Sequence, residues 1–126
     1  MDAIGKIECV VLDVKNLEQK MPFYQDLFGI KFNPPEQHVL SDGTEIKAAW
    51  CPDFGFELVE QTKPRINREG VRAFHIRVKD IAKVKSDFEK RGLRPVREIY
   101  TEKYNIREAV YSVGGYLLDI IQHPDF

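Results

Sequence analysis

Two stretches of eleven residues decide the fold: residues 7–17, IECVVLDVKNL, and residues 71–81, VRAFHIRVKDI. Each begins with β-branched and apolar residues, a pattern that predicts a strand. Each then reaches Asn16 or Asp80, residue types that favour the N-cap of a helix. The chain therefore begins a strand–helix unit twice, with the two starts roughly 64 residues apart.

Each unit is predicted to contain one helix and four strands. The first helix runs from Asn16 to Gly29, and Pro22 inside its pattern is expected to kink the helix or delay its start. The second helix runs from Asp80 to Gly92. Asp42-Gly43 is typical of a type I′ hairpin turn. An extended stretch is expected near residues 30–32. The predicted strands, after the first of each unit, cover residues 45–51, 56–60, 93–99, 107–113 and 116–121.

Composition indicates one folded domain in a reducing compartment. The chain has 126 residues, of which 43% are hydrophobic and 31% charged, enough to form a core without a disulfide scaffold. Its 19 basic and 20 acidic residues leave no positive field for nucleic acid. No apolar run approaches the roughly 18 residues of a membrane span, and Cys9 and Cys51 are too few for a disulfide framework. We therefore expect a soluble, cytoplasmic protein with no nucleic-acid or membrane partner.

The motifs of the two units resemble those of the glyoxalase/bleomycin-resistance/dioxygenase family, also called the vicinal oxygen chelate superfamily. The resemblance implies an α+β fold of two tandem βαβββ modules, whose curled mixed sheet forms an open cup. It implies a single domain over residues 1–126, with modules at about 5–61 and 71–123, a connector at about 62–70, and pairing into a homodimer. The segments that carry it are Phe23–Gly29, Phe56–Glu60, Phe74–Ile81 and Gly115–Ile120.

The same resemblance marks four positions where metal-dependent members carry ligands: Cys9, Glu57, Ala73 and Asp119. Glu57 is of the usual type, and Asp119 is a carboxylate shorter by one methylene. Cys9 is a thiol where an imidazole is expected, and Ala73 has no donor atom. The family's chelate is therefore incomplete. If a divalent ion is bound, the candidate ligands are Glu57, Asp119 and His75, a set that favours manganese, magnesium or iron(II) over zinc.

Strand alternation separates the faces of the first strand of each unit. Positions 10, 12 and 14, and positions 74, 76 and 78, are apolar and are expected to face a helix. The opposite face then carries the more polar side chains. The candidate ligand-binding residues are Cys9, Asp13, Trp50, Glu57, His75, Arg77 and Asp119.

Some of these residues have structural alternatives. Asp13 and Arg77 occupy matching positions in the two units, so an ion pair between them is the favoured interpretation. His75 lies one pleat from the family's ligand position, so it is expected to line the pocket or hydrogen-bond a carboxylate rather than to bind metal. Trp50 and Tyr24 either stack on a planar ligand or belong to the core. Cys9 behaves as a small buried hydrophobe if it has no function.

Three functions follow as hypotheses. The favoured one is a binding protein that holds a small, partly apolar molecule without metal, because Ala73 removes a ligand position. The alternative is a divalent-metal-dependent lyase, isomerase or dioxygenase of the glyoxalase type that uses Glu57 and Asp119. A metal-free enzyme with Glu57 as its general base is the third option. In each case we expect the pKa of one of these two carboxyls to be raised.

Overall fold

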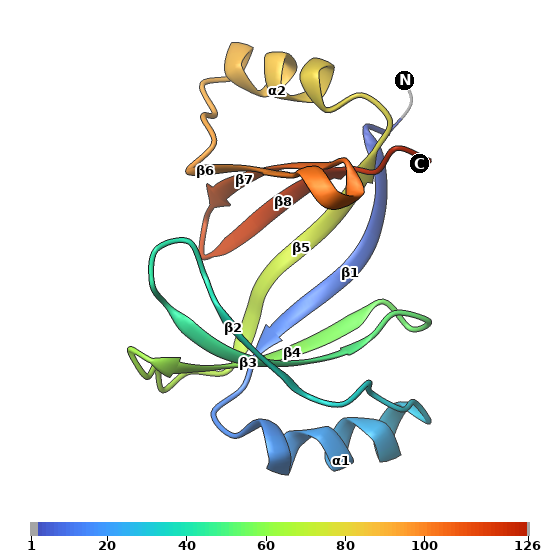
Figure 1. Cartoon of the computed structure of the whole chain (residues 1–126), viewed down its shortest axis with the longest axis vertical. Helices are drawn as coiled ribbons and strands as arrows, with labels where there is room; N and C mark the ends of the chain where they lie inside the picture. The colour runs from blue at the N-terminus through green and yellow to red at the C-terminus, as the bar shows by residue number, and fades with distance from the viewer. Residues whose placement is uncertain (1–2, 126) are drawn as a thin grey trace. The chain divides into compact units, whose positions relative to one another are not determined.

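The computed structural model describes residues 3–125 and contains two βαβββ modules in succession (Figure 1). The first consists of β1 (Gly5–Asp13), α1 (Leu17–Phe28), β2 (Glu36–Val39), β3 (Glu45–Cys51) and β4 (Phe56–Lys63). The second consists of β5 (Gly70–Val78), α2 (Ile81–Lys90), β6 (Arg97–Thr101), the 3-10 helix η1 (Glu102–Tyr104), β7 (Ile106–Val113) and β8 (Tyr116–Gln122). The predicted α+β class and the repeated element order are confirmed. The segment between β4 and β5, residues 64–69, is shorter than the connector expected at 62–70.

Contacts divide the chain into two compact units. The N-terminal unit is Cys9–Arg72, and the C-terminal unit comprises residues 3–8 and 73–125. The strand order is β2-β3-β4-β1 in the N-terminal unit and β5-β8-β7-β6 in the C-terminal unit. In each unit the first strand pairs in parallel with the last strand of its module, and the other pairs are antiparallel. The sequence repeat is thus reproduced as a repeat of topology.

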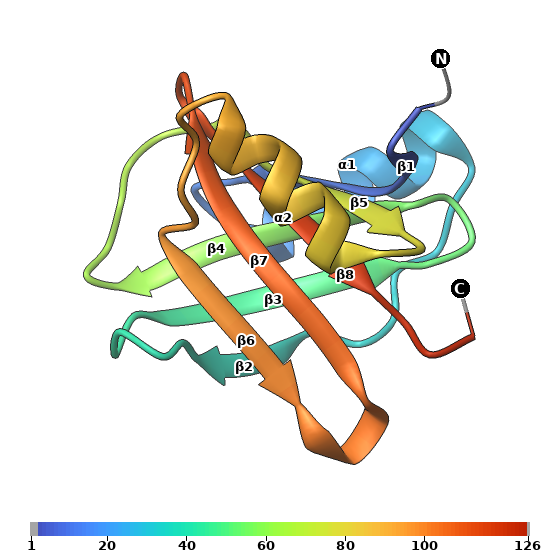
Figure 2. The same ribbon diagram turned by 90° about the horizontal axis from the view of Figure 1, so that it is seen from above.

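Each helix buries one apolar face against the strands of its own unit. Val10 and Leu12 of β1 pack against the core beneath α1, as strand alternation predicts. Figure 2 shows α2 crossing β7 and β8, which supply part of the core beneath it. The buried core of the N-terminal unit is Val14, Leu17, Phe32, Ala49, Cys51, Phe56 and Leu58. The buried core of the C-terminal unit is Val78, Ile81, Val84, Ala109, Tyr111 and Ile120.

Both predicted N-caps are confirmed. The Asn16 side chain accepts a hydrogen bond from the backbone N–H of Gln19 at 3.0 Å, and Asp80 accepts one from Lys83 at 3.1 Å. These bonds satisfy backbone donors that the first turn of a helix leaves unpaired. The expected delay at Pro22 is wrong, since α1 begins at Leu17 directly after its cap and continues through the proline.

Residues 30–32, expected to be extended, are not part of a strand. Phe32 is buried in the core beneath α1, and its N–H donates to the Gln25 side chain at 3.1 Å. The edge strand is β2, which begins after Pro34 and Pro35. Likewise β6 begins at Arg97 rather than at residue 93, because Leu93 packs against the core beneath α2.

The hairpin between β2 and β3 has a different turn from the predicted type I′. Gly43 has a φ of 87°, but Asp42 does not adopt a positive φ. The Gly43 N–H donates to the Leu40 carbonyl at 2.9 Å, and the Leu40 N–H donates to the Thr44 carbonyl at 2.8 Å. This pattern is that of a three-residue loop, in which only the last position requires the left-handed region.

Candidate functional site

Glu57 lies on the sheet face opposite α1. It pairs with Val11 of β1 and with Trp50 of β3, and side chains of paired residues project from the same face of a sheet. Its chain neighbours Phe56 and Leu58 point the other way, into the core beneath α1. Trp50 is 46% exposed, so an accessible aromatic ring stands beside a partly buried carboxyl.

The Glu57 carboxyl has an unusual environment. Within residues 3–125, no group forms a hydrogen bond or ion pair with it. Burial raises the pKa of Glu57 to about 7, and the positive charge of Arg72 opposes part of that rise. The carboxyl is therefore poised between its neutral and ionised forms near neutral pH. A titratable group displaced in this way is typical of a functional site.

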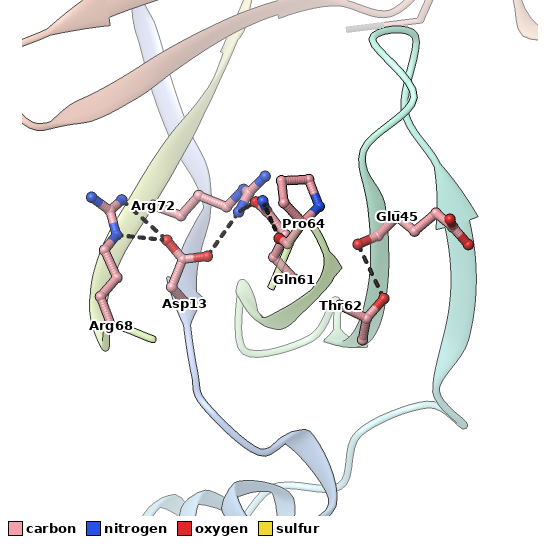
Figure 3. Close-up of polar contacts among 7 residues, drawn as sticks. All are labelled: Asp13, Glu45, Gln61, Thr62, Pro64, Arg68 and Arg72. Atoms are coloured by element: carbon pink, nitrogen blue, oxygen red, sulfur yellow. Dashed lines mark hydrogen bonds and ion pairs between the residues drawn. The ribbon is translucent and has the colours of Figure 1, made fainter. Parts of the chain in front are cut away.

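Asp13, two residues beyond Val11 on β1, forms a buried network with two arginines (Figure 3). The Arg72 Nη1 donates to Asp13 Oδ1 at 2.8 Å, and Arg68 donates to Oδ2 through Nε at 3.3 Å and Nη2 at 3.1 Å. Arg72 also donates to Gln61 Oε1 at 3.3 Å. Asp13 is 1% exposed, so both of its oxygens need these partners.

The predicted ion pair between Asp13 and Arg77 is therefore wrong. Arg77 pairs instead with Glu8 and Asp125, each at 3.1 Å. Asp13 and Arg77 hold equivalent positions in the sequence repeat, but equivalence does not place two residues in contact. The counter-charges of Asp13 come from its own unit.

The connector after β4 is tied to the sheet at this point. Figure 3 shows Gln61 donating through Nε2 to the Pro64 carbonyl at 2.8 Å, and Thr62 donating to the Glu45 carbonyl at 3.2 Å. These bonds fix the chain that leads to Arg68 and Arg72. Arg72, whose positive charge acts on Glu57, is held by hydrogen bonds to Asp13 and Gln61.

Arg68 lies in the segment predicted as a polar connector, Gln61 lies directly before it, and Arg72 lies at the start of the strand predicted after it, so none of the three was a candidate residue. A signal was present: Asp13 was expected on a strand face between apolar neighbours, where a carboxylate requires a cation. Arg68 and Arg72 lie where the chain returns to the sheet, and they were available to supply that charge.

The C-terminal unit places His75 beside Asp119. The two are paired residues of β5 and β8, and His75 Nε2 lies 3.7 Å from Asp119 Oδ2. Burial lowers the pKa of His75, while the charges of Glu108 and Glu8 raise it. The imidazole therefore favours its neutral form. The distance is longer than a hydrogen bond, so the expected role of His75, in lining a pocket or hydrogen-bonding a carboxylate, stays a prediction.

The metal-site prediction gains no support from the donor set. Among the described residues, no group of three or more histidine, cysteine, aspartate or glutamate side chains is placed to hold an ion. The C-terminal unit brings together two candidate ligands, His75 and Asp119, and Glu57 belongs to the other unit. Because the donors do not fit, no step of the proposed function passes through a metal.

The other candidates have simple environments. Cys9 and Cys51 are both buried, and neither forms a disulfide within residues 3–125. Tyr24 packs against the core beneath α1 in edge contact with Phe56, so it does not share the face of Trp50. Ala73 is buried and supplies no donor atom.

Solved structures with the same fold give this geometry its context. A triple mutant of 4-hydroxymandelate synthase from Streptomyces coelicolor superposes with a TM-score of 0.74 at 14% identity, over 95% of this chain and 48% of that one. Methylmalonyl-CoA epimerase from Mycobacterium tuberculosis superposes with a TM-score of 0.66 at 16% identity, over 98% of this chain and 93% of that one. The Streptomyces coelicolor epimerase in complex with 2-nitronate-propionyl-CoA gives 0.68 at 16% identity, over 97% and 99%.

These proteins are members of the vicinal oxygen chelate superfamily, so the chain has the fold of that superfamily. The chain spans about half the length of the synthase and nearly all of the epimerase. No family model and no curated protein matches the sequence. No helix among residues 3–125 is long and apolar enough to cross a membrane.

Proposed function

We propose that the chain binds a small, partly apolar molecule on the sheet face that carries Glu57 and Trp50. The observation behind this proposal is the Glu57 carboxyl itself, which is partly buried, lacks a partner within residues 3–125 and has a pKa of about 7. A fold has no structural need to bury such a group, whereas a ligand with an oxygen or nitrogen atom would complete its hydrogen bonding.

Each side chain has a distinct role in this proposal. Neutral Glu57 donates a hydrogen bond to a ligand oxygen, and ionised Glu57 accepts one from a ligand donor. The exposed ring of Trp50 packs against the apolar part of the ligand. Arg72, held by Asp13 and Gln61, keeps the pKa of Glu57 from rising further. Of the candidates from sequence, His75, Arg77 and Asp119 belong to the C-terminal unit. They are proposed as ligand contacts within that unit, His75 and Arg77 from strand alternation and Asp119 from the resemblance to the family. Cys9 is proposed on the same ground.

A second candidate function is proton transfer, for which Glu57 would be the catalytic residue. A carboxyl with a pKa near the working pH is suited to act as a general base, and two neighbouring structures are epimerases by name.

Trp50 supplies the test, because it is the single tryptophan of the chain and shares the face of Glu57. We would titrate the protein with 4-hydroxymandelate and with methylmalonyl-CoA and follow the fluorescence of Trp50. The proposal predicts a saturable change that is weakened by Glu57→Gln and unaffected by Glu18→Gln, an exposed control in the same unit. Absence of saturation with both probes, or equal binding by Glu57→Gln, would contradict it.

Proton transfer is distinguished from binding alone by following exchange of the α-proton of methylmalonyl-CoA in deuterated water. Binding without exchange would retain the binding function and remove the enzymatic one. Exchange that is lost in Glu57→Gln would establish Glu57 as the base.

We also propose a homodimer in the cytoplasm. Support for the dimer comes from four exposed apolar side chains of the N-terminal unit: Phe23, Leu27, Phe28 and Phe54. Phe28 and Phe54 are in ring contact with each other, and exposed apolar side chains that lie together are typical of an interface.

A further inference from the structure

A groove runs along one face of α2, away from the residues described above. Its cavity volume is about 810 Å³, within the range of small-molecule sites. The α2 wall is formed by residues 80, 83, 84, 87 and 91, whose spacing places them on one side of the helix. Residues 3–6 form the other wall. Lys79, which also lines the groove, lies in the sequence between the end of β5 and the start of α2. The whole groove belongs to the C-terminal unit.

The groove concentrates positive charge. Four cations line it, Lys6, Lys79, Lys83 and Arg91, against the two carboxylates of Asp80 and Asp87. The Asp80 carboxylate is already engaged as the N-cap of α2. This local excess occurs in a chain whose formal net charge is −1.

Three of these cations are available to a ligand. Within residues 3–125, the side chains of Lys6, Lys83 and Arg91 form no hydrogen bond or ion pair. On another side of the same helix, by contrast, Lys85 is paired with Glu98. Like charges gathered without partners repel one another, and a bound anion would relieve that repulsion.

The groove also has apolar surface and a fixed wall. Val84 is buried and Ile4 is 44% exposed, and both line the groove. A Cβ added at Gly5 would lie 2.1 Å from the carbonyl oxygen of Arg77, so only glycine permits the backbone to approach β5 this closely. The close approach sets the position of Lys6 relative to the end of β5.

We infer that this groove binds a small organic phosphate. A phosphate carries about two negative charges at neutral pH, which suits several lysines and an arginine around one cavity. The apolar surface of Ile4 and Val84 receives the organic part of the molecule, and the volume suits a compound of nucleotide size. The inference is independent of the proposed function, because Glu57 and Trp50 belong to the other unit.

The test is an NMR titration of the ¹⁵N-labelled full chain with inorganic pyrophosphate, with ADP and with adenosine. Pyrophosphate and ADP should shift amide signals of residues 3–6 and 79–91, and ADP should bind more tightly. Adenosine, which lacks the charge, should not bind. Added salt should weaken binding, because it screens exposed charges.

Two variants and a matched control locate the site. Lys83→Gln and Lys6→Gln should each lower the affinity for ADP roughly tenfold, the size expected for one charge-assisted contact. Lys90→Gln removes the same charge from an α2 position outside the groove and should leave the affinity unchanged. Equal losses in all three variants would show diffuse attraction and overturn the inference. Absence of ADP binding, or equal shifts with adenosine, would overturn it as well.

Discussion

Asp13 is fully buried, and its carboxylate joins two arginines of very different exposure. The side chain of Arg72 is 18% exposed and that of Arg68 is 57% exposed. Removing the acid leaves the Arg72 cation largely buried with only Gln61 as a partner, whereas removing Arg68 leaves the closer pair intact. The buried contact should therefore dominate the stability of this network.

We predict that Asp13→Asn lowers the free energy of unfolding by about 3 kcal/mol, and that Arg68→Ala lowers it by less than about 1 kcal/mol. The double variant Asp13→Asn with Arg72→Met should recover much of the larger loss, because the buried cation is removed with the acid and the exposed Arg68 is solvated by water. Urea denaturation of the four proteins measures these differences. Equal losses for Asp13→Asn and Arg68→Ala would show that burial does not decide the effect.

Glu57 has the opposite effect on stability. Because its pKa rises from about 4.5 to about 7 on folding, the folded protein binds the proton more strongly than the unfolded chain does. The parent protein should therefore lose stability as the pH rises from about 4.5 to about 7 through this group. Glu57→Gln removes this pH dependence.

We expect the free energy of unfolding of Glu57→Gln to exceed that of the parent by about 2 kcal/mol near pH 7. The difference should vanish as the pH falls toward 4.5. Denaturation at several pH values measures it, with Glu18→Gln as the exposed control. A loss of stability in Glu57→Gln at neutral pH would mean that the carboxylate supports the fold, and the site would be misassigned.

At the residue scale, strand alternation predicted that Asp13 lies on the face opposite the apolar positions of β1, because the period of a strand is fixed by its backbone. Glu57 was a candidate through the resemblance to the family, and no face was predicted for Trp50. The partners of Asp13 could not be predicted in the same way. They come from the connector and the start of β5, and their approach depends on the path of a loop rather than on a period.

At the scale of elements, the two helices begin by the same device. Asn16 and Asp80 each accept a hydrogen bond from the N–H three residues later, and Glu60 adds a bond from the Leu17 N–H to its Oε1 at 2.8 Å. In α2 the Ile81 N–H likewise donates to Gln122 Oε1 at 2.7 Å, so the first turn of each helix has two side-chain acceptors.

We predict that Asn16→Ala and Asp80→Ala each lower the free energy of unfolding by about 1 kcal/mol. The serine variants at both positions should retain most of the stability, because serine also accepts the capping hydrogen bond. Thermal melting and urea denaturation check both pairs. An alanine variant as stable as its serine counterpart would exclude a capping role for that side chain.

The helices and the strands β3, β5, β7 and β8 were predictable to within a few residues, since their apolar periods and caps are local signals. β2 and β6 were not. β2 is an exposed edge strand of four residues with no apolar period, and the start of β6 is shifted by the packing of Leu93 on the helix core.

At the scale of the whole molecule, aromatic side chains remain exposed to water when a single chain is folded. Phe28 is 43% exposed and Phe54 is 50% exposed, and their ring centroids lie 5.1 Å apart. Each exposed ring adds apolar area that a second copy of the chain would remove from water.

We predict a homodimer at micromolar concentration, detected by sedimentation velocity. Phe28→Asp should weaken the dimer by about tenfold or more, while Tyr104→Asp, an exposed aromatic of the C-terminal unit, should not. A parent protein that sediments only as a monomer would contradict the prediction.

The repeat also shows what a sequence period predicts about a whole chain. It predicted two βαβββ modules, whereas the pairing of the first and last strands of each module comes from the structure. It did not predict which residues are in contact. Asp13 and Arg77 hold matching positions in the two modules, yet each pairs with other residues. Ala73 has no donor atom at a position where metal-dependent members of the family carry a ligand. The described residues contain no group of three or more donor side chains placed to hold an ion.

The central claim is that Glu57 is a poised carboxyl in a ligand site, and its pKa is the most direct test. The chain labelled with ¹³C at the glutamate carboxyl is titrated by NMR, and the Glu57 signal is assigned by its absence in Glu57→Gln. We predict a midpoint at about pH 7, which rises further in Arg72→Gln because the opposing positive charge is removed. A midpoint near 4.5, the ordinary value for glutamate, would contradict the account.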